Sequence, residues 1–273
     1  MTKLTLHQTL PPYTVVAKNY ATHHDNNIHS DAGAARYGFA GGLVPGVANY
    51  AYLTRPVVEA LGRAWLERGT LAAKFIHPIY DGETATVRAM VRQVEPLELQ
   101  LELFNEAGKL CAVGTASLPD ELPTLDARDY PWSALPDERW AATIAVVRAG
   151  TELGSLEFTL DLADEFFLEN MQETLPLYRG ADAVFHPAFW PAQANEILLR
   201  NVALGPWIHT ASTVRHYALA RDGERLSLRG RVQQAFEKRG HEIVVLDLAL
   251  FGADERALAH IKHSAIIKLK EAH

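Results

Sequence analysis

The two halves of this 273-residue chain repeat the same order of structural signals. In each half a proline precedes a long apolar segment, which is followed by a strand pattern, an Asp-Gly-Glu turn and further alternating strand patterns. Pro45 and Pro187 are 142 positions apart, and the turns that begin at Asp81 and Asp222 are 141 apart. Residue identity between the halves is sparse, but the shared order predicts one structural unit that is used twice.

Alternating apolar and polar residues predict antiparallel strands in both halves. Leucines occupy every second position from the start of residues 97–104, and residues 244–250 repeat this apolar alternation. Turn signals separate these segments closely, which favours hairpins over βαβ units. Two segments have helical spacing instead, and they begin near Gly46 and Trp190. Pro56 lies inside the first of them and predicts a kink or a division into two short helices.

One long helix followed by several antiparallel strands predicts an α+β protein in which a curved sheet wraps each helix. Residues 119–140 carry four prolines and many acidic residues, which is typical of a linker. We therefore expect one repeat over residues 1–118, a linker over residues 119–140, and a second, more degenerate repeat over residues 141–273.

Composition excludes several classes of partner and site. The formal net charge is -7 and there is no basic run, which argues against nucleic acid and against an anionic membrane surface. Cys111 is the only cysteine, so neither a disulfide within the chain nor a cysteine metal cage can form. No apolar run approaches the roughly 20 residues of a membrane helix, and the start of the sequence lacks the pattern of a signal peptide. We expect a cytoplasmic protein.

The polar stretch from residue 23 to residue 46 resembles two motifs of the MaoC-like dehydratases, the (R)-specific enoyl-thioester hydratases. Their first motif is roughly Gly-Asp-x-Asn-Pro-(Ile/Leu)-His, and residues 23–29 align with it as HHDNNIH. Their second is roughly Gly-Phe-x-x-Pro-Ile-x-His-Gly, and residues 38–46 align with it as GFAGGLVPG. The resemblance covers about residues 20–95. It implies a double hotdog fold and the hydration or dehydration of an acyl thioester, most simply one of coenzyme A.

The match to the family is partial. His24 stands at the position of the family's catalytic Asp, and Asp25 follows it. Asn27 replaces the family's Pro, and Pro45 stands where the family has a His before the helix. The residues that fit the pattern are Asn26, His29, Gly38, Phe39 and Gly46.

The resemblance implies roles that the residue chemistry allows. His29 would be a general acid/base, because the pKa of imidazole lies near neutrality; the alternative is a loop histidine bonded to backbone. Asp25 would orient His29 or act as the second acid/base, and Asn26 would position water or a carbonyl, although both also fit a turn. His24 would replace the family's Asp, or be merely exposed. The N–H of Gly46, at a helix N-terminus, would bind the thioester oxygen, and glycine there would allow the substrate to approach closely.

Other residues are weaker candidates. Pro45 and Phe39 belong to the motif that would contact substrate, and Tyr37 and Tyr50 would line an acyl tunnel or belong to the core. Metal binding by His23, His24 and His29 is disfavoured, because adjacent histidines rarely point the same way and no carboxylate-rich partner is evident.

The second half contributes three residues of interest. His186 immediately precedes Pro187 and is the counterpart of Val44. Glu196 lies on the second predicted helix, where some hotdog thioesterases keep a carboxylate that activates water, although a solvated helix position also fits. His209 is expected on a strand in a structural role.

Three hypotheses follow for function. The first is a hydratase or dehydratase of enoyl or 3-hydroxyacyl thioesters, with His29 and Asp25 as the acid/base pair. The second is a thioesterase on the same fold, with Glu196 or Asp25 activating water. The third is a non-catalytic protein that binds an acyl thioester. All three take an acyl-CoA-like partner and no cofactor, in a pseudo-dimer formed within one chain; a homodimer is also compatible with the sequence.

Overall fold

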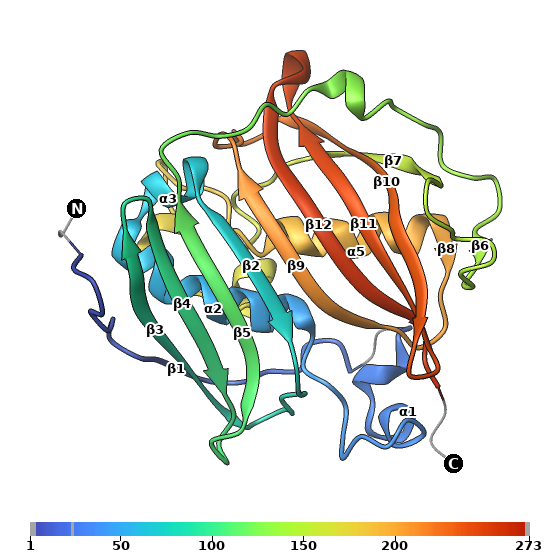
Figure 1. Cartoon of the computed structure of the whole chain (residues 1–273), viewed down its shortest axis with the longest axis horizontal. Coiled ribbons are helices and arrows are strands. Elements are labelled where there is room, and N and C mark those ends of the chain that lie inside the picture. The colour runs from blue at the N-terminus through green and yellow to red at the C-terminus, as the bar shows by residue number, and fades with distance from the viewer. Residues whose placement is uncertain (1–3, 23–24, 271–273) are drawn as a thin grey trace.

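A computed structural model of the chain describes residues 4–22 and 25–270. It is an α+β structure in which a curved antiparallel sheet wraps two central helices (Figure 1). The helices are α1 (Asp31–Ala35), α2 (Gly46–Leu61), α3 (Arg63–Arg68), α4 (Glu165–Asn170) and α5 (Phe189–Asn201). The strands are β1 (Tyr13–Val16), β2 (Thr70–Phe75), β3 (Thr84–Val94), β4 (Leu97–Phe104), β5 (Leu110–Leu118), β6 (Trp140–Ala141), β7 (Glu152–Thr159), β8 (Val202–Ala203), β9 (Ile208–His216), β10 (Arg225–Lys238), β11 (His241–Phe251) and β12 (Ala257–Lys268). Short 3₁₀ turns are η1 (Asn27–His29), η2 (Ala127–Asp129), η3 (Pro176–Tyr178) and η4 (Ala253–Glu255).

The large sheet has the strand order β1-β3-β4-β5-β2-β9-β12-β11-β10-β7. Every pair of neighbours in it is antiparallel, as the alternating sequence pattern and the closely spaced turns predict. β1 to β5 come from the first half of the chain and the other five strands come from the second half. The short pair β6–β8 is parallel and lies outside this sheet.

The two halves of the sheet join where β2 pairs with β9. Leu71 lies opposite Val214 and Ala72 opposite Thr213 in this pairing. Leu71 and Val214 are fully buried, so their side chains contribute to the core that the two halves share. The pairing makes one continuous sheet and leaves no free strand edge at the centre of the molecule.

Helix α2 begins at Gly46, directly after Pro45, as the sequence predicts. It continues through Pro56 to residue 61, so the predicted division at Pro56 is wrong. The helix stops instead at Gly62, which has a φ of 58° in the left-handed region that glycine adopts without a Cβ clash. Pro56 removes one backbone donor, but it is buried and does not end the helix.

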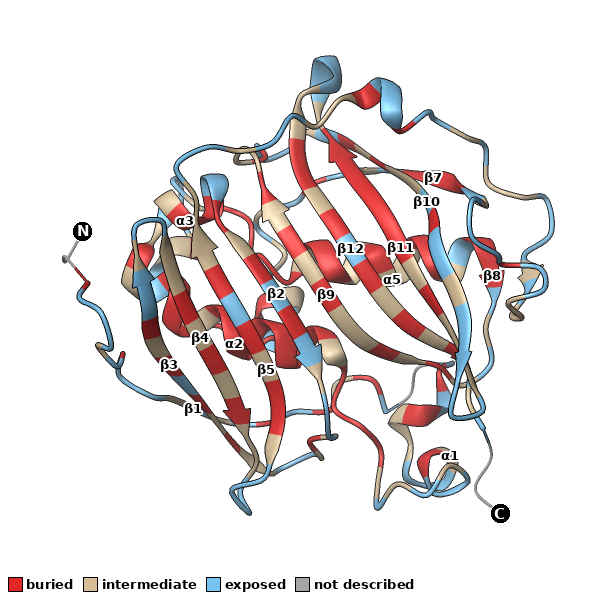
Figure 2. Ribbon diagram, viewed as in Figure 1, coloured by how far each residue is buried: buried red, intermediate tan, exposed pale blue. Residues whose placement is uncertain are grey.

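The core lies between the concave face of the sheet and the two long helices (Figure 2). Most of the residues of α2 are buried, including the β-branched and aromatic ones that face the sheet. α5 buries one apolar stripe that contains Trp190, Ile197 and Leu198. None of the helices in the described part of the chain is long and apolar enough to cross a membrane.

The segment between the two halves packs across the outer face of the second half-sheet. Tyr130 packs against Phe251 of β11, and its hydroxyl donates a 3.3 Å hydrogen bond to Asp247. Asp247 is also 2.7 Å from Nε2 of His260. These contacts fix the proline-rich segment in place, so it covers part of the second half-sheet as well as connecting the halves.

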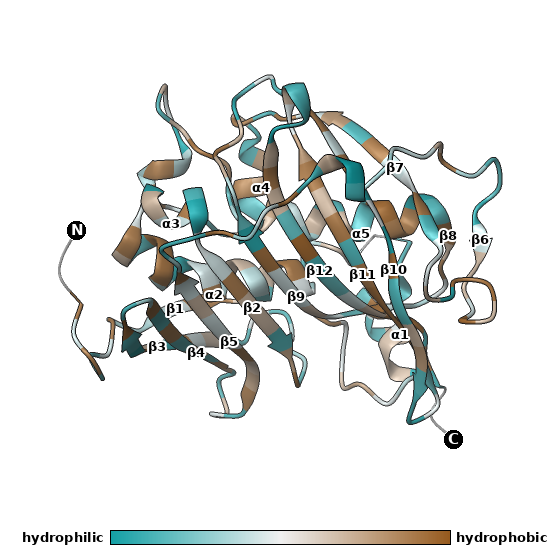
Figure 3. Ribbon diagram, turned by 45° about the horizontal axis from the view of Figure 1, so that its top comes forward, coloured by the Kyte–Doolittle hydropathy of each residue, from teal (hydrophilic) through white to brown (hydrophobic). Residues whose placement is uncertain are grey.

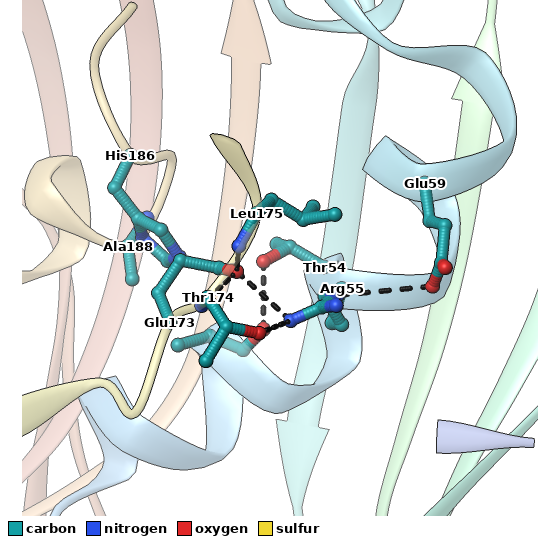
Figure 4. A network of polar contacts seen from close by, with 9 residues as sticks. Thr54, Arg55, Glu59, Glu173, Thr174, Leu175, His186 and Ala188 are labelled. Carbon is teal, nitrogen blue, oxygen red and sulfur yellow. Dashed lines mark hydrogen bonds and ion pairs between the residues drawn. The ribbon is translucent and has the colours of Figure 1, made fainter. Parts of the chain in front are cut away.

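A buried ionic network ties helix α2 to the loop before α5 (Figure 4). Arg55 donates a 2.9 Å hydrogen bond to Oε1 of Glu173, and the same oxygen accepts the backbone N–H groups of Thr174 and Leu175 at 2.7 Å. Nε2 of His186 lies 3.3 Å from Oε2 without the alignment of a hydrogen bond. Burial alone would raise the pKa of Glu173, but His186, the backbone N–H of Leu175 and Arg55 together lower it below its ordinary value.

We predict that Glu173→Gln destabilises the protein by about 1–3 kcal/mol at pH 7, because Arg55 loses its buried counter-charge. Equilibrium unfolding in urea measures the change. Because the folded state lowers the pKa of Glu173, its contribution is present above the unfolded value of about 4.3 and is lost as the pH falls through the folded value. The difference between wild type and variant should therefore shrink in acid. Glu157→Gln, which breaks an exposed pair with Arg225, is the control and should cost much less. Equal costs for the two variants would contradict the assignment.

Candidate functional site

A cavity of about 680 Å³ lies between the two halves of the chain. The loop that carries the predicted motif forms one side, together with the N-terminal turn of α2. The end of β2, the exposed side of α5 and the strands β9 to β12 form the other side. Its volume suits a small-molecule ligand, and its inner lining is mostly apolar.

His29 lines this cavity at the end of the 3₁₀ turn η1. Its Nδ1 lies 2.7 Å from the carbonyl oxygen of Leu43, which can only accept, so Nδ1 carries the proton and donates. In the neutral ring Nε2 is therefore the basic nitrogen. It lies 3.4 Å from Nδ2 of Asn26. The loop thus fixes both the tautomer and the orientation of the imidazole.

Asn26 holds this loop against the second half of the chain. Its Nδ2 donates to the carbonyl of Trp207 at 3.0 Å, and its Oδ1 accepts the Trp207 N–H at 3.2 Å. The amide is buried and pairs with the residue before β9 as a backbone segment would. Asn26 lines the cavity, as predicted for a motif residue, but its main contacts are structural and connect the two repeats.

The first turn of α2 faces the cavity. The carbonyl of Pro45 accepts the N–H groups of Ala48 and Asn49 at 3.0 and 3.3 Å. The N–H groups of Gly46 and Val47 precede these and have no acceptor within the helix. Pro45, Gly46, Val47 and Asn49 all line the cavity. This is the arrangement that favours a partial negative charge at a helix N-terminus.

The reason for glycine at position 46 differs from the one expected. A Cβ there would lie 2.7 Å from Nδ1 of His209 and 3.1 Å from Cε2 of Phe75. The sequence suggested that glycine makes room for substrate; in the structure it makes room first for an imidazole from the second repeat. His209 also lines the cavity, although the sequence indicated only a structural role for it.

His209 belongs to a buried chain of polar groups. Its Nε2 lies 2.8 Å from Oγ of Ser212, which lies 2.9 Å from Nδ1 of His263. The two imidazoles stack with their centroids 4.2 Å apart. Burial, and next the neighbouring His263, hold the pKa of His209 well below its ordinary value, and burial lowers the pKa of His263 to about 3. Both rings are therefore neutral at physiological pH. Nothing in the sequence pairs these histidines, because they lie on different strands.

The two central helices add polar groups that the sequence analysis missed. Asn49 on α2 and Asn195 on α5 both line the cavity, and the Oδ1 of each is buried without a hydrogen-bond partner among the described residues. Buried unpaired amides of this kind are uncommon in proteins and are often satisfied by a ligand or by water. Glu196 of α5 also lines the cavity, and its carboxylate lies 3.7 Å from Nη1 of Arg200.

Other predicted residues are placed differently. Phe39 lines the cavity, whereas Tyr37 packs in a small satellite cluster and Tyr50 is fully buried in the main core. The expected tunnel therefore does not include these two tyrosines. Asp25 is exposed and is not among the lining residues, so the structure does not bring it together with His29 and their pairing stays a prediction. His23 and His24 lie outside the described residues.

The equivalent region of the second repeat, at the N-terminus of α5, is closely packed. Ala188 takes the place of Gly46 and is fully buried. The ring of Phe185 is tilted against that of Trp190, with their centroids 4.5 Å apart, and lies 5.5 Å from the ring of His216. His186 is occupied in the ionic network with Glu173. Large aromatic rings thus fill the space that remains open beside α2. Across the described residues, no group of three or more potential metal ligands gathers.

We predict that Gly46→Ala destabilises the protein by about 1–3 kcal/mol, because the added methyl group overlaps the ring of His209. His209→Ala in the same chain should recover part of that loss, so the two changes are non-additive. Thermal unfolding of both single variants and of the double variant measures the coupling. If the stability losses of the two single variants add up in the double variant, the cost of Gly46→Ala does not come from overlap with His209.

The sequence by itself does not reveal close relatives. No protein-family model matches the chain, and the search of curated proteins found no similar sequence. Solved structures do match over nearly the whole chain. A protein from Chloroflexus aurantiacus J-10-fl described as a MaoC domain dehydratase has a TM-score of 0.68 at 10% identity, over 98% of this chain and 96% of that one.

Two further structures extend the comparison. A Mycobacterium tuberculosis protein described as a double hotdog fold matches with a TM-score of 0.64 at 17% identity, over 96% of each chain. An acyl-ACP thioesterase from Bacteroides thetaiotaomicron matches with a TM-score of 0.52 at 13% identity, over 94% of this chain and 97% of that one. These likenesses confirm the predicted architecture: the chain has the double hotdog fold, shared by structures described as dehydratases and as thioesterases.

Proposed function

We propose that this protein adds water to a 2-enoyl thioester, or removes it from the 3-hydroxyacyl thioester. The observation that carries the proposal is one cavity that holds both a base and an oxygen site. His29 presents an imidazole whose Nδ1 donates to the Leu43 carbonyl, and the first N–H groups of α2 have no acceptor within the helix. These are the two functions that the reaction requires.

In hydration, Nε2 of His29 takes a proton from water as the water oxygen bonds to the β-carbon. The double-bond electrons move to the α-carbon and the thioester oxygen, and the α-carbon then receives the proton that His29 took from water, which regenerates the imidazole. The C–S bond stays intact throughout. The charge that develops on the thioester oxygen would be stabilised by the N–H groups of Gly46 and Val47. Asn49, one turn further along α2, lines the same cavity and would assist by donating from the N–H₂ of its amide.

We predict that His29→Ala lowers the rate of crotonyl-CoA hydration by about 10²- to 10⁴-fold, the usual contribution of one acid/base group. Loss of the enoyl absorbance measures turnover, and unfolding of the variant checks that the loop remains folded. Asp25→Asn is the matched comparison in the same loop. Because Asp25 is exposed and outside the cavity lining, its replacement should cost less than that of His29. If His29→Ala hydrates crotonyl-CoA at the wild-type rate, His29 is not the base. If both variants lose the same factor in rate, Asp25 acts as a pair with His29.

A thioesterase is the second candidate, and one observation favours it. The carboxylate of Glu196 lines the same cavity as His29, so a group able to activate water for attack on the thioester carbon is present. In that reaction water bonds to the carbonyl carbon and the C–S bond breaks, which releases the thiol.

Incubation with matched enoyl-CoA and saturated acyl-CoA esters separates the two candidates. We expect the enoyl ester to gain the mass of one water and to keep its thiol, and the saturated ester to remain unchanged. Release of free thiol from both esters, lost in Glu196→Gln and retained in His29→Ala, would establish the thioesterase instead.

A further inference from the structure

A β-bulge in β9 turns His209 toward the cavity. Buried residues alternate along this strand from His216 back to Ser212, and regular alternation would next bring Thr210 to the buried face. Instead, two consecutive residues of β12 lie opposite Ala211 and His209, so Thr210 is the extra residue of a bulge. The Thr210 hydroxyl donates to a backbone carbonyl of β12 at 3.1 Å, which holds the bulge in place. Bulges often re-aim a side chain next to a functional site, and here the residue re-aimed is one that lines the cavity.

Behind His209 a short chain of polar groups connects β9 with β12. The two strands lie side by side (Figure 1), and hydrophilic residues interrupt the hydrophobic ones along both (Figure 3). Nε2 of His209 is 2.8 Å from Oγ of Ser212, and this oxygen is 2.9 Å from Nδ1 of His263. The outer nitrogens, Nδ1 of His209 and Nε2 of His263, are buried and have no hydrogen-bond partner among the described residues. Because both rings are neutral, each carries one proton, and the single hydroxyl proton couples their tautomers.

The burial of His263 decides the direction of donation along this chain. If His209 donated to Ser212, and Ser212 to His263, the proton of His263 would lie on Nε2. That ring is fully buried and is not among the cavity-lining residues, so this N–H would have no acceptor. Buried N–H groups without an acceptor are rarer in proteins than acceptors without a donor. The opposite direction is therefore favoured, in which Ser212 donates to Nε2 of His209 and the proton of His209 lies on Nδ1.

Nδ1 of His209 lies beside the first turn of α2. A Cβ on Gly46 would be 2.7 Å from this nitrogen, so only glycine backbone separates it from the helix N-terminus. His263 stacks on the imidazole at a centroid distance of 4.2 Å, and Phe75 contacts it edge-on at 4.9 Å, which fixes its orientation. The N–H groups of Gly46 and Val47 have no acceptor within the helix. Donors from both repeats thus gather at one end of the cavity, and a small displacement of the ring from Gly46 would expose Nδ1 to an entering oxygen atom.

We propose that the Nδ1–H of His209 donates a hydrogen bond to the thioester oxygen, beside the N–H groups of Gly46 and Val47. A neutral imidazole suits this role, because it polarises a carbonyl group as a fixed donor in a site from which water is excluded. Ser212 and His263 would act through His209, as positioning residues that set its tautomer. The proposal rests on the acyl-thioester function above and adds a residue of the second repeat to the oxygen site. Negative charge develops on this oxygen in hydration and in thiol release alike, so the role does not depend on which reaction occurs.

The tautomer is tested first, by NMR of the wild-type protein with ¹⁵N-labelled histidine. We expect Nδ1 of His209 to carry the proton and Nε2 to carry none. The ligand is the ketone analogue of butyryl-CoA in which a methylene group replaces the sulfur, because it can neither be hydrated nor release a thiol. Its binding should move the Nδ1 proton resonance of His209 downfield. A proton on Nε2 instead, or an Nδ1 resonance that does not respond to the bound analogue, would overturn the proposal.

Two substitutions of His209 separate the two ends of its ring. Asn places an amide near the position of Nδ1, whereas Gln places one near Nε2 and keeps only the contact with Ser212. We expect His209→Gln to lower kcat for crotonyl-CoA by about 10²- to 10³-fold with little change in KM, as removal of one oxyanion donor does. His209→Asn should retain most of the rate. His216→Gln is the control, since His216 is a buried β9 histidine outside the cavity lining.

An unchanged rate in His209→Gln would show that the oxygen does not need this donor. Equal losses in His209→Asn and His209→Gln, or a matching loss in His216→Gln, would show that the imidazole acts only through packing. The bound analogue, labelled with ¹³C at its carbonyl, gives a readout that needs no turnover. Its infrared carbonyl stretch should lie at lower frequency in wild type and in His209→Asn than in His209→Gln. A failure of hydration would leave this comparison intact, so the two proposals are tested separately.

Discussion

The pairing of β2 with β9 is the constraint on which the rest of the structure depends. Leu71 opposite Val214 and Ala72 opposite Thr213 merge two half-sheets into one. Without that pairing each half would expose a strand edge, and the buried Leu71 and Val214 beside it, to water. With it, α2 and α5 share one core, and residues from both halves meet at the cavity between them. Asn26, which pairs with the backbone of Trp207, reaches across the same junction.

The two repeats share a fold but have diverged at their helix N-termini. Beside α2, a glycine at position 46 admits the ring of His209 and the space next to it stays open. Beside α5, Ala188 and the rings of Phe185 and Trp190 fill the corresponding region. Close packing explains why one position has such influence, since a single methyl group beside an imidazole must displace it. In the second repeat this region is filled by side chains. The second repeat instead contributes lining residues and polar groups to the cavity beside α2.

Electrostatics differ between the inside and the mouth of the cavity. Deep in the site the groups are neutral: His209 and His263 are held uncharged by burial, and the amides of Asn49 and Asn195 carry no charge. Three cations that line the cavity, Lys74, Lys238 and Arg239, are exposed at its mouth and stay in contact with water. This separation suits an amphipathic ligand whose reacting end enters a low-dielectric interior and whose charged end remains near water.

The repeated unit, the antiparallel strands and the start of α2 can be predicted from the sequence, because periodicity and turn residues are local properties that one chain displays directly. It also located the polar loop with His29. The end of α2 was not predicted correctly, because the helix continues through Pro56 and stops only at Gly62. Which distant residues share the site depends on the folding of the whole chain. His209 reaches Gly46, and Lys238 reaches the same cavity as Lys74, because β2 pairs with β9 and β12, β11 and β10 follow in order. Contacts of that kind depend on strand order and register, which no local pattern in the sequence encodes.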